Sequence, residues 1–187
     1  ADLCNKTNQF NTTGQRWSHA DIEDFLVVGG RLICFAVKDK YVEYGIVGAV
    51  LIQQNEIKQF VMSCRVLGLG IEYVAITEIV TIMRIKANSA KIIGSTIVTD
   101  SNMPCRELFA RSGFLQSTED RQIYELPADM LPIGVTHVAV ISLDSQPDET
   151  THTWNGEVVS QQAVILPTIE RKTSQLNTLD STREDVI

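Results

Sequence analysis

The run of residues 65–70, Arg-Val-Leu-Gly-Leu-Gly, has the composition of an anion-binding turn. It joins an apolar run, residues 57–64, to an amphipathic run, residues 71–86. A strand that ends at two glycines and continues as a helix leaves several backbone N–H groups unpaired, and the helix dipole adds partial positive charge there. Glycine also lets a ligand approach backbone that a Cβ would shield. The turn could hold a phosphate or pyrophosphate, or it could be an ordinary strand-to-helix turn with a surface arginine.

Cys64 directly precedes this turn and is a candidate nucleophile. A thiolate there, close to Arg65 and to a helix N-terminus, could carry an acyl group as a thioester. Side chains alternate along a strand, so either Cys64 or its neighbours Ser63 and Arg65 face the ligand side. The alternative is a buried cysteine that acts as a small hydrophobe.

Several amide side chains are candidate contacts to a ligand. Asn8, Gln9 and Asn11 lie close together in the sequence and either cap a turn, line a substrate pocket, or contact a preceding domain. Asn102 precedes a short helical segment, where it is either a cap residue or a ligand contact.

Glu43 and Tyr44 begin an apolar, strand-like run, at a place where a base or a substrate contact could lie. A solvated turn carboxylate is the alternative for Glu43. The four cysteines and three histidines show no paired spacing, so we expect no metal site.

The spacing of apolar residues along the chain predicts the strands and the helix that position these residues. Three strands joined by short connections are expected to form an antiparallel meander. Residues 71–86 have apolar side chains at helical spacing, with Glu72 and Glu78 on other faces of the predicted helix. A strand over residues 91–98 follows, parallel to the third strand because a helix connects them. The three strands of the meander are predicted at residues 31–37, 44–53 and 57–65.

Outside residues 31–98, the sequence patterns indicate helices and strands less strongly. A helix is expected to begin near Ser18, with Asp21 close to capping-box spacing. The further short elements are a helix at residues 105–111 and strands at residues 122–126, 136–143 and 158–166. We expect one domain over residues 1–143, and an extension, residues 144–187, that is loosely ordered because its polar composition buries little surface.

The composition bounds the class of function. The chain has 187 residues, of which 44% are hydrophobic and 21% charged, and a net charge of -7. No basic stripe offsets that charge, which argues against a nucleic-acid partner. Its apolar runs are shorter than a membrane span and no signal segment is visible, so a cytoplasmic protein without a membrane partner is expected. The first residue is Ala1 rather than Met, so the chain could be a piece of a longer protein.

Two resemblances sharpen these expectations. The order of elements and the R-x-x-G-x-G pattern of residues 65–70 resemble a GCN5-related N-acetyltransferase (GNAT) domain and its acyl-CoA pyrophosphate loop. The segments 5–11 (Asn-Lys-Thr-Asn-Gln-Phe-Asn), 39–48 and 60–72 together resemble the C-terminal part of FkbH-like proteins. This second resemblance covers residues 3–126. It implies a GNAT-like mixed sheet, flanked by helices and split around the turn.

FkbH-like proteins join a HAD-type phosphatase-like domain to a GNAT-like domain. They load a glyceryl unit from bisphosphoglycerate onto an acyl carrier protein, a step toward methoxymalonyl extender units for polyketides. The resemblance therefore implies an acyltransferase-type domain that engages phosphopantetheine or coenzyme A, with an acyl carrier protein and an upstream HAD-type domain as partners. It places the cofactor contacts at Arg65, Val66, Leu67, Gly68, Leu69, Gly70 and Asn102, with Cys64 and Glu43 as catalytic candidates.

The sequence departs from the family pattern at several positions. The HAD nucleophile motif is absent, so this chain alone is not expected to dephosphorylate a substrate. Val42 replaces a usual glycine and Ser101 a usual lysine. Phe109 lies four residues before Gly113, where acetyltransferases of this fold often have a tyrosine as general acid, and a phenyl ring cannot donate that proton. A stand-alone acyl-CoA-dependent acyltransferase and a non-catalytic carrier-protein docking module are the alternative functions.

Overall fold

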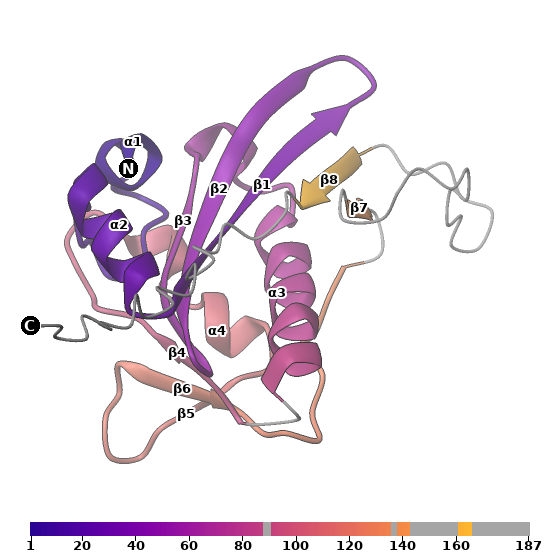
Figure 1. Ribbon diagram of the computed structural model, residues 1–187. Coiled ribbons are helices and arrows are strands. Elements are labelled where there is room, and N and C mark those ends of the chain that lie inside the picture. Colours follow the sequence, from indigo (N-terminus) through magenta and orange to yellow (C-terminus); the bar gives the residue numbers. More distant parts are fainter. Residues whose placement is uncertain (88–90, 136–137, 143–160, 166–187) are drawn as a thin grey trace, which may run out of the picture.

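The computed structural model describes residues 1–87, 91–135, 138–142 and 161–165 (Figure 1). The strands are β1 (Gly30–Asp39), β2 (Glu43–Gln53), β3 (Glu56–Met62), β4 (Ile92–Ser95), β5 (Leu115–Gln116), β6 (Ile123–Leu126), β7 (Val138–Ser142) and β8 (Gln161–Ile165). The helices are α1 (Asp2–Lys6), α2 (His19–Val27), α3 (Ile71–Ala87) and α4 (Leu108–Arg111), and the 3₁₀ turns are η1 (Cys64–Val66) and η2 (Met103–Cys105). One 8-stranded mixed sheet has the order β5-β6-β4-β3-β2-β1-β8-β7, which confirms the α/β class.

The first three strands form the predicted antiparallel meander. Asp39 shapes the turn between β1 and β2, because its Oδ1 accepts hydrogen bonds from the backbone N–H groups of Tyr41 and Val42, both at 2.7 Å. The prediction that the third strand continues to Arg65 was wrong. Beyond Met62 the Ser63 hydroxyl accepts from the backbone N–H of Arg65 at 3.4 Å, and the chain winds into η1.

The helix predicted over residues 71–86 is α3, and β4 pairs parallel to β3 as expected. The pairing of β4 with β3 is short, because only Glu56 and Ile57 of β3 are in register with β4. The strand also ends earlier than predicted, at Ser95, because the next backbone N–H groups turn to other partners. Thr96 donates to the Gln122 carbonyl and Ile97 to the Thr12 carbonyl, each at 2.8 Å.

The N-terminal segment fills the gap that opens where β3 and β4 diverge. The Thr12 N–H donates to the Phe60 carbonyl at 3.0 Å, and the Met62 N–H donates to the Phe10 carbonyl at 2.9 Å. Because Thr12 also accepts from Ile97, this segment bridges β3 and the chain after β4. The sheet is therefore split next to the turn at residues 65–70, but residues 10–12 of the same chain lie inside the split.

Helices cover both faces of the sheet (Figure 1). Alternate residues of a strand point to opposite faces, so neighbouring side chains of β2 enter different cores. Val50 belongs to the core beneath α3 and α4, whereas Leu51 belongs to a smaller core beneath α1 and α2. On that second face Ser18 and Asp21 form the predicted capping box at the start of α2. No helix in the described ranges is both long and apolar enough to cross a membrane.

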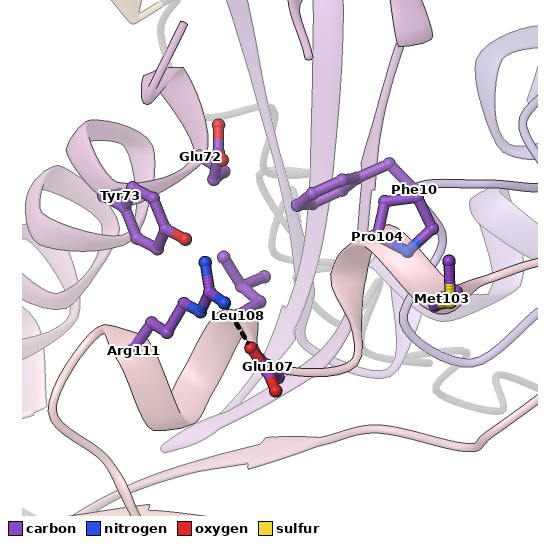
Figure 2. Close-up of a pocket in the computed structure, with 8 residues that line it drawn as sticks. All are labelled: Phe10, Glu72, Tyr73, Met103, Pro104, Glu107, Leu108 and Arg111. Carbon is purple, nitrogen blue, oxygen red and sulfur yellow. Dashed lines mark ion pairs between the residues drawn. The ribbon is translucent and has the colours of Figure 1, made fainter. Parts of the chain in front are cut away.

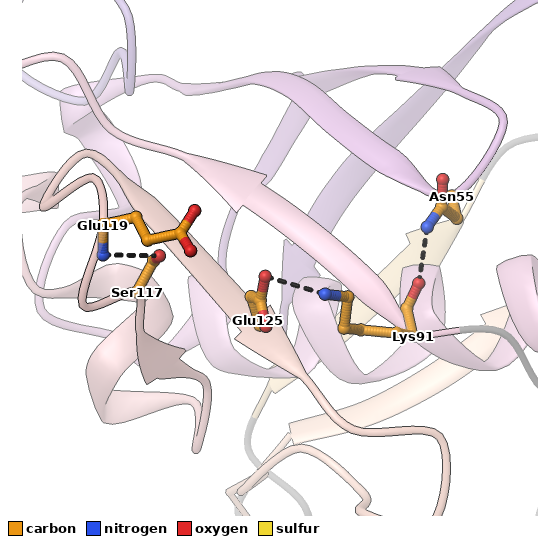
Figure 3. A network of polar contacts seen from close by, with 5 residues as sticks. All are labelled: Asn55, Lys91, Ser117, Glu119 and Glu125. Atoms are coloured by element: carbon orange, nitrogen blue, oxygen red, sulfur yellow. Dashed lines mark hydrogen bonds and ion pairs between the residues drawn. The ribbon is translucent and has the colours of Figure 1, made fainter.

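A polar network fastens β4 to its neighbours at the far edge of the sheet (Figure 3). Lys91 Nζ lies 2.8 Å from a carboxylate oxygen of Glu125 on β6, and Asn55 Nδ2 donates to the Lys91 carbonyl at 2.7 Å. In the turn between β5 and β6, the Glu119 N–H donates to the Ser117 hydroxyl at 3.3 Å. The two contacts of Lys91, the residue before β4, therefore tie the start of this short strand to β6 and to the β2–β3 turn.

The last described strands include part of the predicted extension. Strand β7 corresponds to the strand expected at residues 136–143, and β8 to the one expected at residues 158–166. Strand β8 pairs antiparallel with β1 and parallel with β7. Residues 161–165 therefore join the main sheet although they fall within the range 144–187, and the rest of that range lies outside the described residues.

Candidate ligand-binding site

The turn at residues 65–70 is anchored by its apolar residues and leaves its glycines accessible. Val66 is fully buried, and Leu67 and Leu69 are half-buried against the main core. Gly68 and Gly70 have positive φ angles of 81° and 71°, which glycine adopts at little cost. A Cβ added at Gly68 would have nothing within 4 Å, so the space in front of this backbone is open.

The start of α3 presents the donors that an anion would need. The Gly70 carbonyl accepts from the N–H groups of Tyr73 and Val74, at 3.2 and 3.5 Å, so helical pairing begins there. Within the described part of the chain, the N–H groups of Gly68 and Gly70 have no hydrogen-bond partner. The dipole of this long helix adds partial positive charge at the same place.

A pocket of about 250 Å³ lies beside the start of α3 (Figure 2). It is lined by Phe10, Glu72, Tyr73, Met103, Pro104, Glu107, Leu108 and Arg111. Its residues come from three places: the N-terminal segment between α1 and α2, which supplies Phe10, the first turn of α3, and the stretch from η2 to α4. Half of these residues are apolar, and the other half, Glu72, Tyr73, Glu107 and Arg111, are ionisable.

Glu72 was predicted on a face of the helix other than that of the apolar residues, and that placement was wrong, because the side chain is buried beside them. The side chain is only 8% exposed, and its Oε2 atom is buried with no hydrogen-bond partner. Burial raises the pKa of Glu72, while a hydrogen bond from its own backbone N–H and the charge of Arg111 act in the opposite direction. A buried carboxyl oxygen without a partner costs stability, which is typical of a functional position.

Arg111 supplies the positive charge at the pocket mouth. Its guanidinium lies 2.6 Å from the Glu107 carboxylate, and both side chains are exposed. In Figure 2 the hydroxyl of Tyr73 is directed toward the same guanidinium. Tyr73 first, and then Glu107, raise the pKa of Arg111, so this group stays charged. The signal that could have found the site was an acidic residue in the first turn of a helix that follows Gly-x-Gly.

Asn11 and Asn102 lie next to each other, but their side chains form hydrogen bonds within the protein interior. Both are fully buried. Asn102 Oδ1 accepts from the N–H of Thr99 at 2.9 Å, and its Nδ2 donates to the carbonyls of Ile97 and Asn11, at 2.8 and 3.1 Å. Asn11 Oδ1 accepts from Gln59 Nε2 at 2.6 Å. The chain itself therefore satisfies the side-chain oxygen and nitrogen of both residues.

The other polar candidates of the N-terminal segment are on the surface. Asn8 is exposed and its side-chain oxygen accepts a hydrogen bond from Arg16. Gln9 is exposed as well. Neither residue lines the pocket, although Phe10, which follows them, forms one of its walls.

The two predicted catalytic residues lie apart from the pocket. Cys64 is exposed in η1 rather than at the end of a strand, so strand alternation does not set its direction. Arg65, also exposed, donates from Nε to the Ser63 hydroxyl at 3.2 Å. Glu43 is exposed at the hairpin end of β2, in register with Lys38. Neither Cys64 nor Glu43 is among the described residues that line the pocket.

Phe109 takes no part in the pocket. Its ring is fully buried, with centroids 5.2 Å from that of Phe114 and 5.8 Å from that of Tyr124. In the described ranges, no three side chains of histidine, cysteine, aspartate or glutamate come together as a metal site would require. Comparison with protein-family models and with curated proteins returned no match for this chain.

Proposed function

We propose that this chain is the acyl-carrier-engaging domain of an FkbH-like protein and binds the phosphopantetheine arm, or coenzyme A, at the start of α3. The observation that carries the proposal is the backbone of Gly68 and Gly70, whose N–H groups have no hydrogen-bond partner among the described residues. An added Cβ at Gly68 would meet nothing within 4 Å, and the pocket begins two residues after Gly70, at Glu72. The GNAT-like order of elements and the split between β3 and β4 support it.

The proposed binding mode follows from what already occupies the split. Residues 10–12 pair with Phe60 and Met62, so the arm would not lie between β3 and β4. It would lie over the side chain of Phe10, in the pocket, with its phosphate on the backbone of Gly68 and Gly70. In this arrangement the turn binds the charged phosphate, and the pocket binds the uncharged part of the arm.

Phosphopantetheine supplies a thiol that carries acyl groups, and this chain's residues would bind and orient it. The exposed Cys64 remains a candidate for a covalent step within a larger assembly that includes an upstream HAD-type domain. The absence of a hydroxyl at Phe109 and its place in the core disfavour ordinary acetyl transfer from acyl-CoA. A non-catalytic docking module for a carrier protein is the second candidate, because Cys64 and Glu43 both lie apart from the pocket.

Titration of the full chain with coenzyme A tests the proposal. Gly68→Asp puts a negative charge against the phosphate and is expected to weaken binding about tenfold or more. Gly68→Asn is the matched control, because asparagine has the same shape, carries no charge and also tolerates positive φ. Equal affinity for the aspartate and asparagine variants, or no binding by the unmodified chain, would contradict the proposal.

A further inference from the structure

The free oxygen of Glu72 has no role in the proposed phosphate contact and requires an explanation of its own. It is buried, has no partner among the described residues, and lines the pocket. A carboxyl oxygen accepts hydrogen bonds, so the group that best satisfies it is a hydroxyl or an amide N–H. A phosphate or carboxylate at the same point would meet like charge.

The rest of the pocket narrows the ligand further. Phe10, Met103, Pro104 and Leu108 give it apolar walls. Three other ionisable residues line the pocket with Glu72. Tyr73 belongs to α3, Arg111 to α4, and Glu107 directly precedes α4. Arg111 and Glu107 pair with each other at 2.6 Å. The apolar walls and the unpartnered oxygen of Glu72 therefore suit an uncharged aliphatic group that carries a hydrogen-bond donor.

Resting on the proposed function, we infer that Glu72 accepts a hydrogen bond from a hydroxyl or amide N–H of the pantetheine arm, and that the pocket holds the uncharged segment next to the phosphate. This segment of the arm has two methyl groups, a hydroxyl and an amide, which match the apolar walls and the buried, unpartnered oxygen of Glu72. Glu72 lies only two residues after Gly70, so the pocket and the proposed phosphate contact are adjacent.

The test compares two ligands on the full chain by calorimetry. Coenzyme A carries both the pyrophosphate and the arm, whereas ADP carries the pyrophosphate without the arm. Glu72→Leu removes the acceptor, and we expect it to weaken coenzyme A binding about tenfold while ADP binding changes less than about twofold. Glu72→Gln keeps a neutral acceptor of the same shape and should lose only about threefold for coenzyme A.

Glu78→Gln is the control, because Glu78 is a half-buried glutamate on the same helix that does not line the pocket. It should leave the affinity for both ligands unchanged. If Glu72→Leu weakens both ligands equally, or neither, the inference is wrong while the proposed function stands. If the unmodified chain binds neither ligand, the inference and the proposed function are both wrong. Should the leucine variant fail to fold, the glutamine variant decides, and unchanged coenzyme A affinity in it overturns the inference.

Discussion

The side chain of Asn102 donates from Nδ2 to the backbone carbonyl of Asn11 at 3.1 Å, across 91 positions of sequence. This bond ties the segment that fills the split between β3 and β4 to the chain just before η2. Phe10 on one side and Met103 on the other both line the pocket, so the bond fixes two of its walls relative to each other. An interior amide pair of this kind positions a site without contacting its ligand.

Replacing Asn102 should therefore destabilise the fold. Asn102→Ala leaves several buried donors and acceptors unpaired, and we expect the free energy of unfolding to fall by about 3 kcal/mol. Urea denaturation measures this change. Gln9→Ala, at an exposed neighbour of the same segment, should change it by less than about 0.5 kcal/mol. A loss below about 1 kcal/mol in Asn102→Ala would show that its hydrogen bonds are not structural.

Glu72 should make stability depend on pH in a defined direction. Its pKa is raised in the folded chain, so the folded state disfavours the ionised form. The wild type loses stability as pH rises from below the ordinary glutamate pKa through the raised one. Glu72→Gln lacks this loss and should be about 1 kcal/mol more stable at neutral pH, with the difference vanishing in acid.

Thermal unfolding of both proteins at acid and neutral pH checks this prediction. Glu23→Gln, at an exposed glutamate of α2, serves as the control and should leave stability within about 0.5 kcal/mol at either pH. An advantage of Glu72→Gln that is the same at both pH values would contradict the assignment, because the raised pKa would then not be its cause.

Introducing a tyrosine at residue 109 should not create an acetyltransferase. The ring of Phe109 is enclosed, and a Cβ added at Gly94 would come within 2.6 Å of its Cζ. A hydroxyl on Cζ would be crowded by core atoms, so Phe109→Tyr should lower the free energy of unfolding by about 2 kcal/mol. Thermal unfolding measures the loss of stability, and thiol release from acetyl-CoA measures acetyltransferase activity. Tyr124→Phe is the matched control, and faster thiol release in Phe109→Tyr would refute this placement.

The sequence was most informative where its periodicity was strong. The alternation and the helical spacing of residues 44–86 predicted β2, β3 and α3 because apolar patterns reflect burial directly. The turn with Gly68 and Gly70 was placed correctly between β3 and α3 for the same reason. Strand ends were less predictable, because the end of β4 depends on hydrogen bonds to Gln122 and Thr12, which are distant in sequence.

The candidate site could be predicted only in part. Its glycines were visible as a local motif, but the pocket is built by Phe10, Glu72 and residues after Asn102, which only the folded chain brings together. The burial of Glu72 was missed because a charged residue in a first helical turn is usually solvated. Asn11 was predicted either to cap a turn or to contact a ligand or a preceding domain. It is buried, and its Oδ1 accepts from the backbone N–H groups of Thr13 and Gly14, as a turn cap does.

Cys64 should be dispensable for folding and for ligand binding. Its side chain is exposed and does not line the pocket, so Cys64→Ser should change the free energy of unfolding by less than about 0.5 kcal/mol. Coenzyme A affinity should also stay within about twofold of the wild type. Thermal unfolding and calorimetry test this pair of expectations. A tenfold loss of affinity would place Cys64 in the binding site, contrary to the geometry.

The central claim is that the backbone of Gly68 and Gly70 binds the phosphate end of the ligand. Nuclear magnetic resonance tests it most directly, because the amide signals of glycines are well separated and respond to a new hydrogen bond. On titration of the full chain with coenzyme A, we predict that the amide signals of Gly68 and Gly70 shift together and saturate, while that of Gly45, in the β1–β2 hairpin, stays in place. Saturable binding that leaves the Gly68 and Gly70 signals unmoved would contradict the account.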